Sequence, residues 1–127
     1  MPLAFLVAMA PIHAAAPGNW QFVYVNRSSD LNVISGEALL TGSSGKLSGT
    51  LTAEHDVQFS IDANINGDEV TATFGSLESD DGGTRLNGTF RQTTMLVPGG
   101  TNCRQTIQLS DGFSSLALAR NVPSCES

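Results

Sequence analysis

Apolar and polar residues alternate on both sides of the dipeptide Asn66-Gly67, and no other feature of the chain constrains its fold as closely. Asn-Gly favours a two-residue hairpin turn between antiparallel strands. With the turn at this dipeptide, apolar residues meet across the two strands: Ile61 faces Ala72, Phe59 faces Phe74 and Ala63 faces Val70. The residues between them are polar, so the sequence predicts a hairpin with one buried face and one solvated face.

The same alternation recurs along the rest of the chain. It predicts eight strands and almost no helix, over residues 20–25, 37–41, 46–52, 57–64, 69–74, 85–93, 105–110 and 113–119. In the expected pairing Leu40 faces Leu47, whereas residues 27–35 fit a strand, a turn or one helical turn. Short strands in hairpin succession predict an all-β, antiparallel up-and-down meander. A closed barrel, which removes the sheet edges, is favoured over a sandwich.

A short run with a central glycine occurs twice in this pattern. Leu47-Ser48-Gly49-Thr50-Leu51 is followed later by Leu86-Asn87-Gly88-Thr89-Phe90. Both glycines are predicted to face inward, where a glycine permits sharp coiling of the strand or the close approach of a ring from the next strand. In the expected register, Phe59 would supply that ring over Gly49.

The N-terminal segment predicts export. Residues 3–16 form an apolar run of small residues that ends in Ala14-Ala15-Ala16, which is typical of a signal peptide, although no Lys or Arg precedes it. The run is shorter than the roughly 20 apolar residues that span a bilayer. We therefore expect residues 1–16 to be a signal peptide, residues 17–127 to form a single barrel domain, and the protein to be secreted or periplasmic.

The cysteines and the charge balance agree with an exported protein. Cys103 and Cys125 are the two cysteines of the chain and predict one disulfide. With Asp111-Gly112 as a hairpin turn, Cys103 falls opposite Arg120, and the tail can bring Cys125 back to the same edge. The formal net charge of −6 disfavours binding to nucleic acid or an anionic membrane and suits a basic protein partner.

A family resemblance follows from these features. Gly18-Asn19-Trp20 at the first strand, the Leu-x-Gly-Thr strand and a meander over nearly the whole chain resemble the small calycin-type barrels, the lipocalin and avidin group. The resemblance implies an eight-stranded barrel whose open end can hold an apolar or small polar ligand. Avidin-type barrels stack several tryptophans around biotin, whereas Trp20 is the single tryptophan here. Biotin binding is therefore not expected, and no binding residue of the family carries over.

The polar residues do not predict catalysis, a cofactor or a metal site. His55 is the single histidine after residue 16 and lies in an expected turn, without the nucleophile and orienting group that a triad needs. Residues 62–68 match the start of an EF-hand loop, but Thr73 stands where the bidentate Glu belongs. The acidic residues Glu78, Asp80 and Asp81 suggest a solvated connector, with a weak calcium site or a contact for a basic partner as alternatives.

The aromatic residues suggest one hypothesis about function, and two alternatives stand beside it. They can simply fill the barrel, or they can line a pocket, because inward alanines and glycines leave space for one. Four of them are the candidate ligand-binding residues: Trp20, Tyr24, Phe59 and Phe90. The first hypothesis is a non-enzymatic barrel that binds a small apolar or amphipathic ligand. The second is a protein-binding module, such as an inhibitor of an extracellular or periplasmic hydrolase, and the third is a structural surface component.

Overall fold

A computed structural model describes residues 17–27, 32–43, 45–76 and 83–125. Most of these residues lie in eight antiparallel strands: β1 (Gly18–Asn26), β2 (Asn32–Ser43), β3 (Lys46–Ala53), β4 (Gln58–Asn66), β5 (Glu69–Ser76), β6 (Thr84–Val97), β7 (Gly100–Ser110) and β8 (Ser114–Val122). A 3₁₀ turn, η2 (Glu54–Asp56), joins β3 to β4. Within the described residues, no helix is long and apolar enough to cross a membrane.

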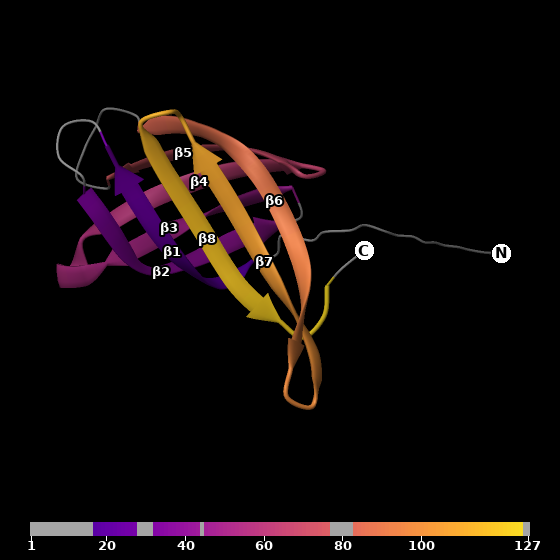
Figure 1. The fold of residues 1–127 in the computed structure, drawn as a ribbon. Helices are drawn as coiled ribbons and strands as arrows, with labels where there is room; N and C mark the ends of the chain where they lie inside the picture. The colour runs from indigo at the N-terminus through magenta and orange to yellow at the C-terminus, as the bar shows by residue number, and fades with distance from the viewer. Residues whose placement is uncertain (1–16, 28–31, 44, 77–82, 126–127) are drawn as a thin grey trace.

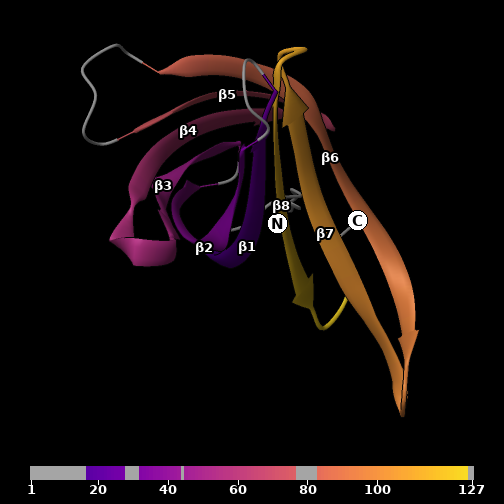
Figure 2. The ribbon, with the colours of Figure 1, turned by 60° about the vertical axis from the view of Figure 1, so that its left-hand side comes forward.

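The strands close into a barrel. Each pairs with its neighbours along the chain, and β1 also pairs with β8, where Gln21 lies opposite Ala119 and Asn26 opposite Ser114 (Figure 1; Figure 2). Closure gives both outer strands a partner, so the wall of the barrel has no open edge. The predicted fold class, an all-β up-and-down meander barrel with one disulfide, is confirmed.

The two ends of the barrel differ. At one end β1 begins and β8 ends, and the β6–β7 hairpin projects beyond the wall (Figure 1; Figure 2). We call this the arm end. The opposite end carries η2 and the β7–β8 turn, and we call it the far end.

Side chains alternate between the interior and solvent, as the sequence predicts. The apolar residues that point inward are at most 8 % exposed: Trp20, Phe22, Ala38, Leu40, Leu47, Leu51, Ala53, Ile61, Ala63, Val70, Ala72, Phe74, Leu86, Phe90, Cys103, Ile107, Leu109, Leu116 and Leu118. Apart from the disulfide-bonded Cys103, these side chains pack together in the middle of the barrel. Their burial is the main source of stability for a sheet of this kind.

The predicted pairing register is wrong by two residues in four hairpins. Ile61 faces Phe74, not Ala72, and Leu40 faces Gly49, not Leu47. The other predicted pairs move in the same way: Phe59 faces Ser76 and Ala63 faces Ala72 in β4–β5, Gly49 faces Ile61 in β3–β4, and Cys103 faces Val122 in β7–β8. Each inward residue stays inward, because side chains alternate with a period of two.

Turn geometry causes the shift. The β4–β5 turn is Gly67-Asp68, not Asn66-Gly67, because Asn66 still pairs with Glu69. Gly67 has a φ of 68°, which suits the first central position of a type II′ turn. In the β3–β4 turn, Ala53 N–H donates to Val57 O at 2.8 Å, and His55 at its centre has a left-handed φ of 62°.

The inward glycines Gly49 and Gly88 allow the backbone of the adjacent strand to approach closely. A Cβ atom at Gly49 would collide with the carbonyl oxygen of Leu39, and one at Gly88 would collide with that of Gln108. Phe59 was predicted to lie opposite Gly49, but Ile61 takes that place. The glycines therefore let adjacent strands coil closely around the barrel, which is the first of the two predicted reasons.

The predicted disulfide is present. Cys103 and Cys125 are bonded, with their Cα atoms 5.0 Å apart. A disulfide is compatible with an extracellular or periplasmic protein. The predicted signal peptide, residues 1–16, and the acidic residues Glu78, Asp80 and Asp81 lie outside the described residues.

Candidate functional site

The four predicted ligand-binding residues do not gather at one place. Tyr24 and Phe59 both contact Phe74, whereas Trp20 packs against Arg120. Trp20 and Tyr24 are four residues apart on β1, a distance of about 13 Å along a strand. Phe90 is 5 % exposed within the core. The four residues, which were predicted to line one pocket, therefore belong to two separate clusters and to the core.

The arm-end cluster is a partly buried polar network. The Arg120 guanidinium lies 4.7 Å from the centre of the Trp20 ring. Its Nε donates to Gln105 Oε1 at 2.8 Å, and Gln105 Nε2 donates to Gln92 Oε1 at 2.9 Å. Gln105 is 1 % exposed, and burial lowers the pKa of Arg120 from its usual value, although an arginine stays charged at neutral pH. This network links β1, β6, β7 and β8 near the base of the projecting hairpin.

The far-end cluster consists of three stacked or tilted rings. The ring centroids of Tyr24 and Phe74 are 4.7 Å apart, and those of Phe59 and Phe74 are 5.1 Å apart. Tyr24 is on β1 and Phe74 on β5, which are not neighbouring strands, so the rings meet across the interior. The Tyr24 hydroxyl donates to Ser114 Oγ at 3.0 Å. Tyr24 and Phe59 remain only partly buried and are the predicted residues best placed to contact a ligand at this end.

The projecting hairpin is the most distinctive element of the molecule. β6 pairs with β7 as far as Val97 and Gly100, whereas β8 pairs with β7 only as far as Cys103. We call residues 94–102, which form the end of this hairpin, the arm. The arm extends away from the barrel in both ribbon views (Figure 1; Figure 2). At its tip, Gly99 has a φ of 89°, as the third residue of a type II turn after Pro98 requires.

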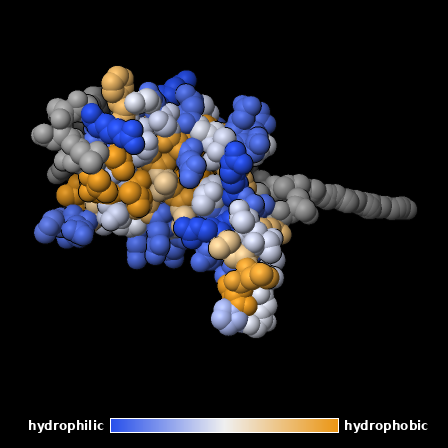
Figure 3. Space-filling view, viewed as in Figure 1, coloured by the Kyte–Doolittle hydropathy of each residue, from blue (hydrophilic) through white to orange (hydrophobic). Residues whose placement is uncertain are grey.

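The arm exposes three consecutive apolar side chains. Met95 is 41 % exposed, Leu96 88 % and Val97 37 %, and Figure 3 shows hydrophobic surface near the end of the projection. Leu96 is the most exposed large apolar side chain among the described residues. Since these residues contribute little to the core, their presence at the tip requires another explanation.

One edge of the arm carries no strand. The ladder between β5 and β6 ends at the pair Glu69–Thr89, followed by one bond in which Phe90 N–H donates to Asp68 O at 2.9 Å. Backbone groups alternate in direction along a strand, so those of Thr94 and Leu96 point to the same side as those of Phe90. In the described part of the chain, no strand pairs with that side of β6 beyond Phe90.

The base of the arm is held firmly. Cys103 is fully buried and bonded to Cys125, so the chain after β8 is tied to the point where the arm leaves the barrel. Thr94 pairs with Cys103, and its hydroxyl lies 3.7 Å from Cys125 Sγ. The covalent bond and the ladder together fix the direction in which the arm projects.

The hairpin that carries the arm differs in charge from the rest of the chain. β6 and β7 together contain three arginines, Arg85, Arg91 and Arg104, and no Asp or Glu between Thr84 and Ser110. All twelve carboxylates lie elsewhere in the chain, with only three other basic residues. The net charge of −6, from which a basic partner was predicted, therefore does not describe the surface that projects furthest.

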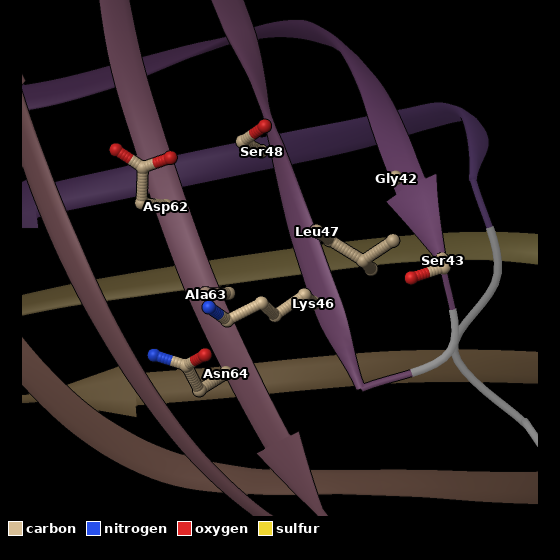
Figure 4. A pocket seen from close by; sticks show the side chains of 8 residues that line it. All are labelled: Gly42, Ser43, Lys46, Leu47, Ser48, Asp62, Ala63 and Asn64. Carbon is tan, nitrogen blue, oxygen red and sulfur yellow. The ribbon is translucent and has the colours of Figure 1, made fainter.

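A concave region also lies on the wall of the barrel. A cavity of about 410 Å³ is lined by residues of β2, β3 and β4: Gly42, Ser43, Lys46, Leu47, Ser48, Asp62, Ala63 and Asn64 (Figure 4). The Lys46 side chain extends across β4 near Asn64 (Figure 4). Within this mixed lining Ser48 lies opposite Asp62 in the β3–β4 ladder, and no histidine is among the lining residues.

The single histidine of the described residues lies in a turn. His55 is exposed in η2, next to a cavity of about 250 Å³ between β2 and the β3–β4 turn. Among the described residues, no group of three or more His, Cys, Asp or Glu is placed to share a metal ion.

The arm is the element that the sequence analysis missed. The predicted strands stopped at Thr93 and resumed at Gln105. The signal was present in Thr93, Thr94, Met95, Leu96 and Val97, which favour strands, followed by Pro98-Gly99, which favours a type II turn. Searches against protein-family models, curated proteins and solved structures found no match.

Proposed function

We propose that this protein is an exported, non-enzymatic binding module that contacts another polypeptide through the arm. The observation that carries the proposal is Leu96, 88 % exposed beside a strand edge that no described strand covers. The barrel then serves as a scaffold that holds the arm away from its own surface.

The chemistry of the arm suits an extended polypeptide strand. An unpaired edge offers main-chain donors and acceptors, which a strand from a partner can satisfy by adding to the sheet. Natural proteins usually protect such edges with charges, prolines or bulges. Residues 93–97 contain no charge and no proline, and no described strand pairs with this edge.

The predicted export belongs to the same proposal. The disulfide at the base of the arm persists in an oxidising compartment, and the N-terminal run of residues 3–16 is typical of a signal peptide. The partner is therefore expected outside the cytoplasm, on a cell surface, in a periplasm or in the medium.

Site-specific photo-crosslinking tests this proposal. Leu96 is replaced by p-benzoylphenylalanine, and the protein is irradiated in its native compartment. Leu39, which is 56 % exposed on the barrel wall, is replaced in the same way as the matched control. We expect adducts with a polypeptide from position 96 and few from position 39. The absence of adducts from position 96, or equal yields from both positions, would reject the arm as the binding element.

A second candidate function rests on the far-end cluster. We propose that the partly buried Tyr24 and Phe59 rings, together with Ile34, can contact a small apolar or amphipathic ligand, as the calycin resemblance implies. Phe74 supports both rings from within the barrel. Flat aromatic surfaces of this kind bury a large apolar area with little loss of side-chain entropy.

A fluorescent apolar probe tests the second candidate. We expect 1-anilinonaphthalene-8-sulfonate to bind the folded protein and the Phe59→Ala variant to bind it more weakly. Phe113→Ala is the matched control, because Phe113 is 67 % exposed on the β7–β8 turn and takes no part in the ring cluster. Equal binding by both variants would remove the far-end cluster as a ligand site.

A further inference from the structure

We propose that the strand bound by the arm is the same strand of a second copy of this chain, so that two β6 edges pair antiparallel around a twofold axis. This inference rests on the proposed function, because it takes the arm to be the binding element, and it goes further by naming the partner. The two hairpins would join into one four-stranded sheet in the order β7, β6, β6, β7. An interface of this type is isologous, since each copy presents the same residues.

The direction of the backbone groups fixes the register. Thr94 and Leu96 direct their N–H and C=O groups to the open edge, as argued above from the bond between Phe90 and Asp68. In an antiparallel pair these two residues exchange hydrogen bonds when Thr94 of one copy faces Leu96 of the other. The twofold axis then passes between the two Met95 residues.

This register brings the exposed apolar side chains of the two copies close together. Residues directly opposite each other lie on the same face of a sheet. Met95 therefore meets Met95 of the second copy, Val97 meets Thr93, and Leu96 meets Thr94. Met95 and Val97 share one face of the arm and Leu96 lies on the other, so on each face the apolar side chains of the two copies become direct or diagonal cross-strand neighbours. These contacts give a physical reason for their place at the tip.

The charge distribution permits two copies to meet here. No charged residue lies between Arg91 and Arg104, so the register places no two like charges opposite each other, an arrangement that would be destabilising. The carboxylates of the described residues lie outside β6 and β7, and the arm holds the contact away from the barrel wall (Figure 2). The repulsion between two chains of net charge −6 therefore acts over a longer distance, where salt screens it.

Proline substitutions separate edge pairing from other modes of association. Thr94→Pro removes an N–H that points to the open edge, and proline is tolerated where the N–H faces solvent. The first matched control is Thr101→Pro, because Thr101 faces Leu96 across the hairpin and directs its N–H to the opposite edge of the arm. The second control, Thr94→Ala, changes the side chain and keeps the N–H.

Sedimentation of the purified protein from about 1 μM to about 1 mM is the measurement. We expect the wild-type chain to dimerise and Thr94→Pro to weaken the dimer at least about tenfold, with both controls within about twofold of wild type. A dimer that Thr94→Pro leaves unchanged would overturn the inference.

Charge variants at Met95 keep the test decisive if the proline variant fails to fold. The side chain of Met95 is 41 % exposed, so polar replacements are compatible with the barrel. Met95→Arg and Met95→Asp each place like charges opposite each other at the twofold axis, so each variant alone should be monomeric. An equimolar mixture should recover the dimer as a heterodimer. Failure of the mixture to recover it would overturn the proposed register.

Failure of this inference can be told apart from failure of the proposed function. A wild-type chain that stays monomeric over the whole range would reject self-pairing. If position 96 then still forms adducts with a different polypeptide, the arm remains the binding element with another partner. If position 96 forms no adducts at all, both proposals fall.

Discussion

At the residue scale, one arginine organises the arm end of the barrel. Arg120 stacks on Trp20 and donates to the buried Gln105, and its Nη1 also donates to Pro17 O at 3.1 Å. Hydrogen bonds to a charged group contribute more than neutral ones, and a buried acceptor that loses its donor is costly. Arg120 therefore stabilises both the first and the last strand.

We expect Arg120→Met to lower the free energy of unfolding by about 1–3 kcal/mol, because the buried Gln105 loses its charged donor. Urea denaturation provides the measurement. The control is Arg104→Met, since Arg104 is exposed and its contact to Asn121 Oδ1 is long, at 3.4 Å. That variant should stay within about 0.5 kcal/mol of wild type. Equal losses in the two variants would contradict the network.

Asp111 gives a prediction for pH dependence. Its Oδ1 accepts hydrogen bonds from the backbone N–H groups of Ser114 at 2.7 Å and Phe113 at 2.9 Å. These bonds lower the pKa of Asp111 below its usual value. A lowered folded-state pKa stabilises the fold above the unfolded pKa, and this contribution is lost as the pH falls through the folded value.

Asp111→Asn keeps an oxygen acceptor and removes the charge. We expect a lower thermal midpoint than wild type at pH 7 and a smaller difference near pH 2, because the contribution of the charged carboxylate is lost as the pH falls through the lowered pKa of Asp111. Thermal unfolding, monitored by circular dichroism at both pH values, measures these midpoints. A difference of the same size at both values would show that the charge of Asp111 does not contribute.

At the element scale, the sequence predicts which face of each strand is buried but not the register. Alternation has a period of two, so pairings that differ by two residues bury the same side chains. The choice between Asn66-Gly67 and Gly67-Asp68 as a turn depends on local backbone conformation. The arm escaped prediction because Met95, Leu96 and Val97 are consecutive apolar residues outside the core and show no alternation.

The separation of the four predicted ligand-binding residues was not visible in the sequence for a related reason. Trp20 and Tyr24 share a face of β1, and their sequence spacing alone does not show that they belong to opposite ends of a barrel. Arg120 and Gln105, which complete the Trp20 cluster, lie on β8 and β7, far from β1 in the sequence. Only the closure of β1 against β8 brings these residues together.

The disulfide gives a prediction for the arm and its base. Cys103→Ser combined with Cys125→Ser should lower stability by about 3 kcal/mol on the loop-entropy model and the thermal midpoint by roughly 10 °C. The β signature in circular dichroism should persist, because all eight strand pairings remain. Wild-type protein from its native compartment should contain no free thiol by alkylation under denaturing conditions. Two alkylated cysteines would contradict the disulfide and the oxidising location.

At the scale of the whole molecule, the chain separates a closed scaffold from a projecting element. In the barrel the first and last strands pair with each other, and the apolar side chains are buried in the interior. The arm differs in both respects, since it extends beyond the wall with exposed apolar residues and an edge with which no described strand pairs. The division predicts that the arm can be shortened without loss of the fold.

The most direct test replaces residues 96–101 by Asn-Gly, a two-residue turn that closes on the Met95–Asn102 pair. Wild-type and shortened proteins are isolated from their native compartment without denaturation and compared by native mass spectrometry. We expect the wild-type chain to carry a bound polypeptide, a second copy or another chain, and the shortened protein to be a folded single chain. Recovery of the same complex from both proteins, or of a single chain from both, would contradict the assignment of binding to the arm.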